Sequence, residues 1–142
     1  MERKIVHVVG TGTIGEPLIG ILCEQKSSLG IDEVTFHKQS PLTKDAPKIK
    51  NLITKGARLS VHEDRVESFK EIGLEPEFIM EEAVSRSSVV IDCTPKGYGH
   101  KNKVDFYEKY ADKVKGFLAQ GSEDGFGKKY ARGINDHVIN SE

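Results

Sequence analysis

The chain has 142 residues, 37% hydrophobic and 30% charged, which is enough apolar material for the core of one folded domain. Its formal net charge of -1 gives no overall positive field that would favour nucleic acid or an acidic membrane as a partner. The sequence has no run of about 18 apolar residues and no signal-peptide core, so we expect a cytoplasmic protein.

The first elements are the clearest. Apolar residues predict a strand over Ile5–Val9, buried on both faces, that stops at the turn Gly10-Thr11-Gly12-Thr13-Ile14-Gly15. A helix should follow and end near Gly30, with its buried side formed by Leu18, Ile19, Ile21 and Leu22. Residues 33–36 predict a second strand, and the polar residues 37–48 predict a loop.

The same alternation continues to residue 121. Residues 49–56 predict a short helix, 57–61 a half-exposed strand, 66–73 a helix, and 89–93 a second fully buried strand. A loop over 94–99, a helix over 104–110 and a core strand over 116–120 complete the series. Strands that alternate with helices are typical of a Rossmann-like, open doubly wound α/β fold with a mainly parallel sheet and helices on both faces. We expect one domain over 1–142, with its core in 1–121 and a tail at 122–142.

Two cysteines are present, Cys23 and Cys93. They are far apart in the sequence, and neither has a second cysteine or histidine at metal-ligand spacing. We therefore expect two buried thiols, with no disulfide and no metal site.

The glycine turn has the G-x-G-x-x-G pattern between a buried strand and a helix, which is typical of dinucleotide binding. Gly10 would form the tight turn, Gly12 would let a diphosphate approach the backbone, and Gly15 would let the helix pack on the strand. Thr13 and Ile14 would offer backbone amides at the helix N-terminus. The alternative is a glycine turn that serves packing alone.

The end of the second strand bears on the choice of cofactor. An acidic residue there commonly binds the adenosine ribose of NAD, and residues 36–40 contain none. His37, Lys38 and Ser40 could instead donate to a 2'-phosphate, which favours NADP over NAD, unless they form an ordinary solvated loop. The loop over 94–99 could line the ribose or nicotinamide side of the cleft, or be a plain turn.

Three runs carry a family resemblance: G-T-G-T-I-G at 10–15, D-C-T-P-K-G-Y-G-H-K-N at 92–102 and Q-G-S-E at 120–123. In this order they resemble the amino-terminal domain of archaeal-type glyceraldehyde-3-phosphate dehydrogenase, over nearly the whole chain. The resemblance implies a nicotinamide nucleotide as partner, bound by Gly12, Thr13 and Ile14 at the pyrophosphate and by His37 and Lys38 at the adenosine ribose. It implies that the nicotinamide half is bordered by Thr94, Pro95, Gly97, Gln120 and Gly121.

Two departures from that family matter. Residues 36–49 lack its usual lysine-threonine pattern, which leaves NAD or NADP open. The chain also stops before the family's segment with the nucleophilic cysteine, so we assign no catalytic residue and expect a truncated chain that binds cofactor without turnover. A missing catalytic domain or a homodimer would cover its exposed face. The alternatives are a free-standing nucleotide-sensing regulatory domain and a fold that has lost binding.

Overall fold

The structure is a computed structural model that describes residues 3–120 together with residues 126, 128, 134 and 137. Within this part of the chain, six parallel strands form one sheet in the order β4-β3-β2-β1-β5-β6. The strands are β1 (Ile5–Val9), β2 (Glu33–His37), β3 (Arg58–Val61), β4 (Phe78–Ile79), β5 (Val89–Asp92) and β6 (Gly116–Ala119). The α-helices are α1 (Gly15–Glu24), α2 (Lys26–Leu29), α3 (Ala46–Thr54), α4 (Val66–Glu71), α5 (Met80–Ser85) and α6 (Tyr98–Asp105). The 3-10 helices are η1 (Thr43–Asp45), η2 (Glu63–Arg65) and η3 (Tyr107–Tyr110).

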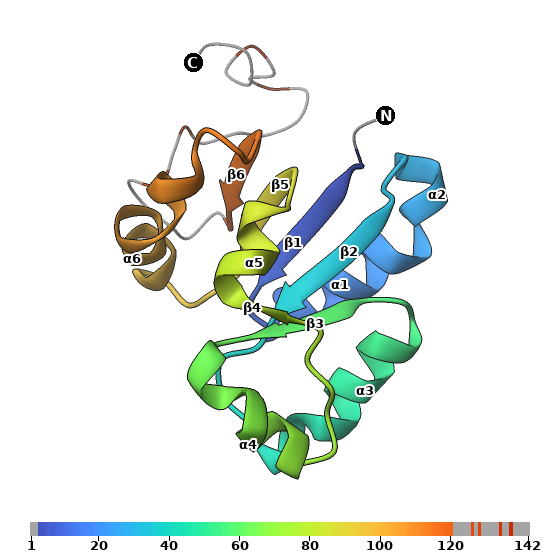
Figure 1. Cartoon of the computed structure of the whole chain (residues 1–142). Helices are drawn as coiled ribbons and strands as arrows, with labels where there is room; N and C mark the ends of the chain where they lie inside the picture. The colour runs from blue at the N-terminus through green and yellow to red at the C-terminus, as the bar shows by residue number, and fades with distance from the viewer. Residues whose placement is uncertain (1–2, 121–125, 127, 129–133, 135–136, 138–142) are drawn as a thin grey trace.

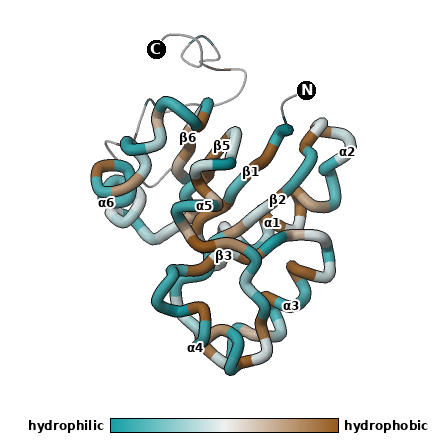
Figure 2. The backbone as a smooth tube through the Cα atoms, in the orientation of Figure 1, coloured by the Kyte–Doolittle hydropathy of each residue, from teal (hydrophilic) through white to brown (hydrophobic). Residues whose placement is uncertain are grey.

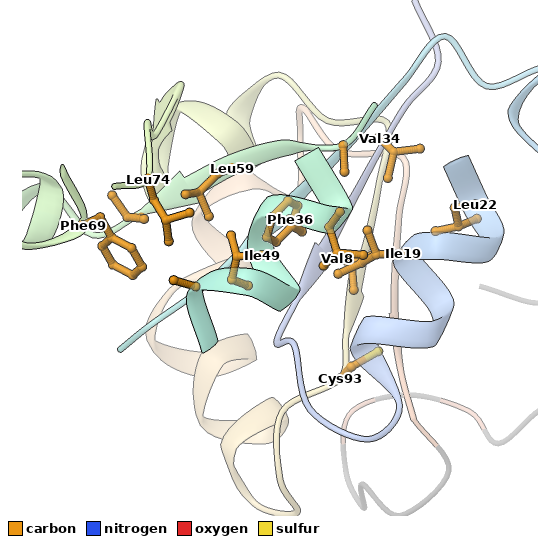
Figure 3. Close-up of a cluster of buried hydrophobic side chains, with 14 residues drawn as sticks. Val8, Ile19, Leu22, Val34, Phe36, Ile49, Leu59, Phe69, Leu74 and Cys93 are labelled. Carbon is orange, nitrogen blue, oxygen red and sulfur yellow. The ribbon is translucent and has the colours of Figure 1, made fainter. Parts of the chain in front are cut away.

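Helices cover both faces of the sheet, with α5 in front of the strands and α1 behind them in Figure 1. Successive side chains of a strand point to opposite faces. Val8 and Phe36 therefore pack with α1, α3 and α4 in the larger apolar cluster, which Figure 3 shows. Val9 and Val90 pack on the other side with α5 and η3. The prediction of a doubly wound, Rossmann-like α/β fold is confirmed.

Burial of strands from both sides explains their composition. In Figure 2, β1 has the colour of hydrophobic residues over most of its length, and Ile5, Val8 and Val9 are buried. Because parallel strands with helices on both faces have no wet side, β-branched apolar runs are the residues that suit them.

The order of the strands determines where a crevice opens at the carboxyl ends of the sheet. From β1 the chain builds β2, β3 and β4 on one side of the sheet, and it then places β5 and β6 on the other side of β1. The connections that follow β1 and β5 therefore leave the sheet in opposite directions. Such a switch point opens a crevice at the carboxyl ends of the two strands, where open α/β sheets bind their ligands.

Three strand predictions were wrong in part. β3 is not half-exposed, because β4 pairs with its outer edge and Leu59, Ser60 and Val61 are buried. β5 is buried at alternate positions only, at Val90 and Asp92. β6 is the edge of the sheet rather than a core strand, and its Leu118 is 53% exposed.

The helices also differ from expectation in their bounds. Ile21, expected on the buried side of α1, is 55% exposed. The predicted loop over 37–48 is shorter, since η1 and the start of α3 occupy its second half. The helix expected over 104–110 begins earlier, because α6 takes the last two residues of the loop predicted over 94–99, and η3 replaces it after Phe106, whose φ of -136° is not helical. β4 and α5 were not expected, because they are too short to show a hydrophobic period in the sequence.

Most of the tail over 122–142 lies outside the described residues. Ile134, one of its few apolar residues, is 83% exposed. Among the residues that the structure describes, no helix is long and apolar enough to cross a membrane. The single domain and the homodimer stay predictions.

Candidate functional site

A cavity of about 1030 Å³ opens at the carboxyl ends of β1, β2, β5 and β6. This volume lies at the upper end of the range for small-molecule pockets. Ten of the predicted site residues line it: Gly10, Gly12, Thr13, Ile14, His37, Lys38, Ser40, Thr94, Pro95 and Gln120. Gly15 and Gly97 are not among the lining residues, and Gly121 lies outside the described residues.

Two glycines of the first turn are required by the fold itself. Gly10 has a φ of +106°, and a Cβ on it would stand 3.1 Å from the backbone of Cys93 at the end of β5. A Cβ on Gly15 would stand 2.0 Å from the carbonyl oxygen of Gly10, where no atom fits. These residues let the turn close and α1 pack against it, and Figure 3 shows Cys93 beside that turn.

Gly12 differs from both. Its φ is not positive, and no heavy atom of the described residues lies within 4 Å of the position that a Cβ would take. The side chain of a larger residue would extend into open space at the mouth of the cavity. The protein itself gives no reason for a glycine here, whereas a ligand in close contact with the backbone would.

The turn leads to the N-terminus of α1, where Ile14 holds the cap position and no side chain caps the helix. The first amides of a helix have no partner within it and carry partial positive charge. Glu16 N–H already donates to the carbonyl oxygen of Gly12 at 3.1 Å, so the donors left for an anion at the cavity edge are the amides at Thr13 and Ile14.

A lysine from α3 adds a full positive charge at the same place. Lys48 Nζ donates to the carbonyl oxygen of Thr11 at 2.9 Å and lines the cavity. Carboxylate oxygens of Glu16 and Asp45 lie 3.8 and 4.0 Å from Nζ, which are long distances for ion pairs. Sequence reasoning missed Lys48, because only the packing of α3 beside α1 brings it to the turn.

The residues at the end of β2 are less available than expected. His37 is buried, and burial lowers its pKa to about 4, so the ring is neutral at pH 7. Its Nδ1 lies 3.4 Å from Ser60 Oγ on β3. Lys38 lines the cavity, and its Nζ lies 2.8 Å from a carboxylate oxygen of Asp45. The hydrogen bond from Lys38 lowers the pKa of Asp45, so this pair stays charged.

The segment after β3 supplies a second group that sequence reasoning missed. Arg65, the last residue of η2, lines the cavity beside His62 and Asp64. Its Nη1 donates to the carbonyl oxygen of Gln39 at 2.8 Å. This hydrogen bond holds the guanidinium against the segment that follows β2.

Asp92, at the end of β5, organises the second loop. Its fully buried carboxylate accepts hydrogen bonds from the backbone N–H and hydroxyl of Thr94, from Asn102 Nδ2 and from the Tyr107 hydroxyl. The bonds from Thr94 N and Asn102 Nδ2 are both 2.9 Å long. The carboxylate thus joins β5 to α6 and η3, which gives a physical reason for the Asp, Thr and Asn of this motif.

The same loop is held from the edge strand. Gln120, directly after β6, donates from Nε2 to the carbonyl oxygen of Thr94 at 2.8 Å. Gly97 has a φ of +92° and stands at the N-cap of α6, so its role in the structure is in the turn. Thr94, Pro95 and Gln120 therefore form the part of the cavity wall at the ends of β5 and β6, next to the glycine turn.

The structure offers no activated thiol at this edge. Cys93 is buried, and burial together with the nearby Asp92 raises its pKa to about 11, so the thiol is protonated at pH 7. Cys23 is only half-buried, which corrects the prediction of two buried thiols. Within the described part of the chain, no three His, Cys, Asp or Glu side chains are grouped to hold a metal ion.

The curated proteins that are similar to this chain share one name. No protein-family model matches the chain. Curated relatives named glyceraldehyde-3-phosphate dehydrogenase include those of Pyrobaculum neutrophilum, 31% identical over 84% of this chain, and Methanobacterium bryantii, 32% identical over 93%. That of Methanopyrus kandleri is 42% identical over 49% of this chain. The matches span 32%, 41% and 20% of these relatives, so the chain corresponds to less than half of their length.

Among solved structures, a universal stress protein from Archaeoglobus fulgidus in complex with dAMP matches 84% of this chain and 98% of its own. The TM-score is 0.40 and the sequence identity 12%, which is too distant to support any argument about this chain.

Proposed function

We propose that this chain is a nicotinamide-nucleotide-binding region of a glyceraldehyde-3-phosphate dehydrogenase-like oxidoreductase, with the diphosphate of the cofactor against the turn between β1 and α1. The observation that carries the proposal is Gly12. It lines the cavity, and neither its backbone conformation nor any described neighbour requires a glycine there. A ligand whose oxygens contact the backbone explains its identity.

The charges at the turn suit a diphosphate. The uncapped N-terminus of α1 offers amide donors, and Lys48 adds an ammonium group at the carbonyl oxygen of Thr11. Hydrogen bonds in which one partner is charged are roughly twice as strong as neutral ones. A diphosphate would engage both kinds of donor at once, while its charge would outweigh the two distant carboxylates that now face Lys48.

The wall at the ends of β5 and β6 is suited to the nicotinamide half. Thr94 and Pro95 stand at the end of β5, beside the glycine turn, and Gln120 fixes the backbone of Thr94. The four hydrogen bonds that Asp92 accepts hold this loop in one conformation. A rigid wall lets a site orient the reactive ring of a cofactor without first ordering the protein.

Within an oxidoreductase, these residues bind and orient the cofactor. The nicotinamide ring, when bound, accepts or gives a hydride. Cys93 does not supply a nucleophile, because its thiol is buried and protonated at neutral pH. We therefore assign cofactor binding to the described site and place no catalytic residue in it.

Calorimetric titration of the chain tests the proposal. We expect NADP and NAD to bind one site per chain, with adenosine diphosphate ribose competing against both. Absence of binding by all three ligands, with an intact circular dichroism spectrum, would contradict the proposal. Oxidation of glyceraldehyde 3-phosphate is expected to be absent from this chain alone, and robust turnover would contradict the assignment of binding without catalysis.

A further inference from the structure

The ends of β2 and β3 lie side by side at the cavity. The register pairs His37 with Ser60, and Lys38 N donates to the Ser60 carbonyl oxygen at 3.1 Å. Residues directly after β3 therefore stand next to residues directly after β2, where Rossmann-like folds receive the adenosine ribose. A side chain from the β3 side can reach the same ribose hydroxyl groups.

The two cationic candidates from the β2 side contribute little charge there. His37 is neutral at pH 7, because burial lowers its pKa to about 4. The Lys38 ammonium is compensated by Asp45 at 2.8 Å, and the two side chains are only 15% and 17% exposed. A phosphate bound by Lys38 would compete with a carboxylate that is already in contact and held in place.

Arg65 lines the same cavity and offers the positive charge that neutral His37 and paired Lys38 do not offer to a ligand. Only its Nη1 is engaged in the hydrogen bond to the Gln39 carbonyl oxygen, a neutral acceptor, and a guanidinium carries five N–H donors. Its charge also contributes to the lowered pKa of His37, which is consistent with its closeness to the end of β2. The planar fork suits the bidentate binding of a phosphate.

We propose that Arg65, from the segment after β3, binds the 2'-phosphate of NADP and is the residue that selects NADP over NAD. The inference rests on the proposed nucleotide site and adds its specificity. Asp64 is the carboxylate nearest in sequence, and its side chain is 85% exposed and directed at His62, 3.6 Å from Nδ1. Water and salt screen such an exposed charge, so it opposes a phosphate only weakly.

The test compares NADP and NAD on the full chain by calorimetry. Arg65→Gln removes the charge, and Arg65→Lys keeps the charge without the fork. Lys70→Gln is the matched control, since it removes one positive charge from the neighbouring α4, where Lys70 is exposed and pairs with Glu67. We expect Arg65→Gln to weaken the binding of NADP about 10- to 100-fold and the binding of NAD less than about threefold. The NADP affinity of Arg65→Lys should lie between those of the wild type and Arg65→Gln, and Lys70→Gln should change neither affinity.

Three results would overturn the inference while the proposed function stands. They are an equal loss of NAD and NADP affinity in Arg65→Gln, no loss in that variant, and a larger loss of NADP preference in Lys38→Gln. An equal loss would mean that Arg65 contacts the adenine or the shared ribose instead. If the wild-type chain binds neither nucleotide, the proposed function itself fails.

Discussion

The substitution Gly12→Val separates binding from folding more sharply than any other in this chain. The valine side chain would extend into the open mouth of the cavity, where no described atom lies within 4 Å of its Cβ. A bound diphosphate would have to move away from the turn and lose hydrogen bonds to the backbone amides. Loss of two charge-assisted bonds, at about 1.5–3 kcal/mol each, corresponds to a fall in affinity of at least about 100-fold.

Stability should change little in the same variant. A Cβ at this position meets no described atom within 4 Å, and replacing glycine lowers the entropy of the unfolded chain, which stabilises a protein by about 0.4–1 kcal/mol. We therefore expect its free energy of unfolding in urea to stay within about 1 kcal/mol of wild type. Gly15→Ala provides the contrast, because its Cβ would lie 2.0 Å from the Gly10 carbonyl oxygen and force the backbone to shift. That variant should lose about 1–3 kcal/mol of stability.

The assay is calorimetric titration of NADP, paired with urea denaturation of each variant. Gly116→Val in β6 is the matched control, because its Cβ also meets no described atom within 4 Å and Gly116 does not line the cavity. It should bind NADP as the wild type does. Wild-type affinity in Gly12→Val would refute the close approach of a ligand to this backbone. A loss of stability like that of Gly15→Ala would show that the space around Gly12 is not open.

Three further changes test the remaining charges. Lys48→Met should weaken the binding of NAD and NADP alike by about tenfold in the same titrations and reduce the dependence of binding on salt, since its ammonium would face the diphosphate that both nucleotides share. Asp92→Asn should lower the free energy of unfolding by about 1–3 kcal/mol in urea, because the amide presents an N–H donor where four donors converge. Burial lowers the pKa of His7 to about 3 and of His37 to about 4, from 6.5. The unfolded chain therefore binds protons at a higher pH than the folded chain does. The free energy of unfolding in urea should fall as the pH drops from 6.5 to about 4, by at most about 2.7 kcal/mol per pH unit for the two histidines together. His37→Gln should halve that slope.

The parts of the fold that sequence predicts are those with a local cause. A β-branched run such as Ile5–Val9 suits a strand covered on both faces, and the glycines after it are required by the turn, so both could be read from neighbouring residues. β4 has two residues and α5 has six, too few for a hydrophobic period to appear. The exposure of Leu118 depends on the position of β6 at the sheet edge, which is a property of the whole topology.

The cationic groups of the site could not be predicted in this way. Lys48 reaches the glycine turn from α3, and Arg65 reaches the segment after β2 from η2, which follows β3. Each contact joins residues that are distant in the sequence, and neither Lys48 nor Arg65 belongs to a motif. Lys38 was predicted from its position after β2, but the charge on Asp45 that compensates it comes from η1. Sequence position gives the edge of the sheet where a charge lies, and only tertiary contacts decide which charge faces the ligand.

The glycine pattern therefore combines two separate requirements. Gly10 and Gly15 are needed by the protein, since a Cβ on either would meet backbone atoms at 3.1 or 2.0 Å. No described residue requires a glycine at position 12, and the proposed nucleotide would account for it. A chain that kept the first and third glycines but carried a larger residue at the second would fold in the same way and lose the nucleotide. The full pattern indicates binding, as opposed to fold alone, only through its middle residue.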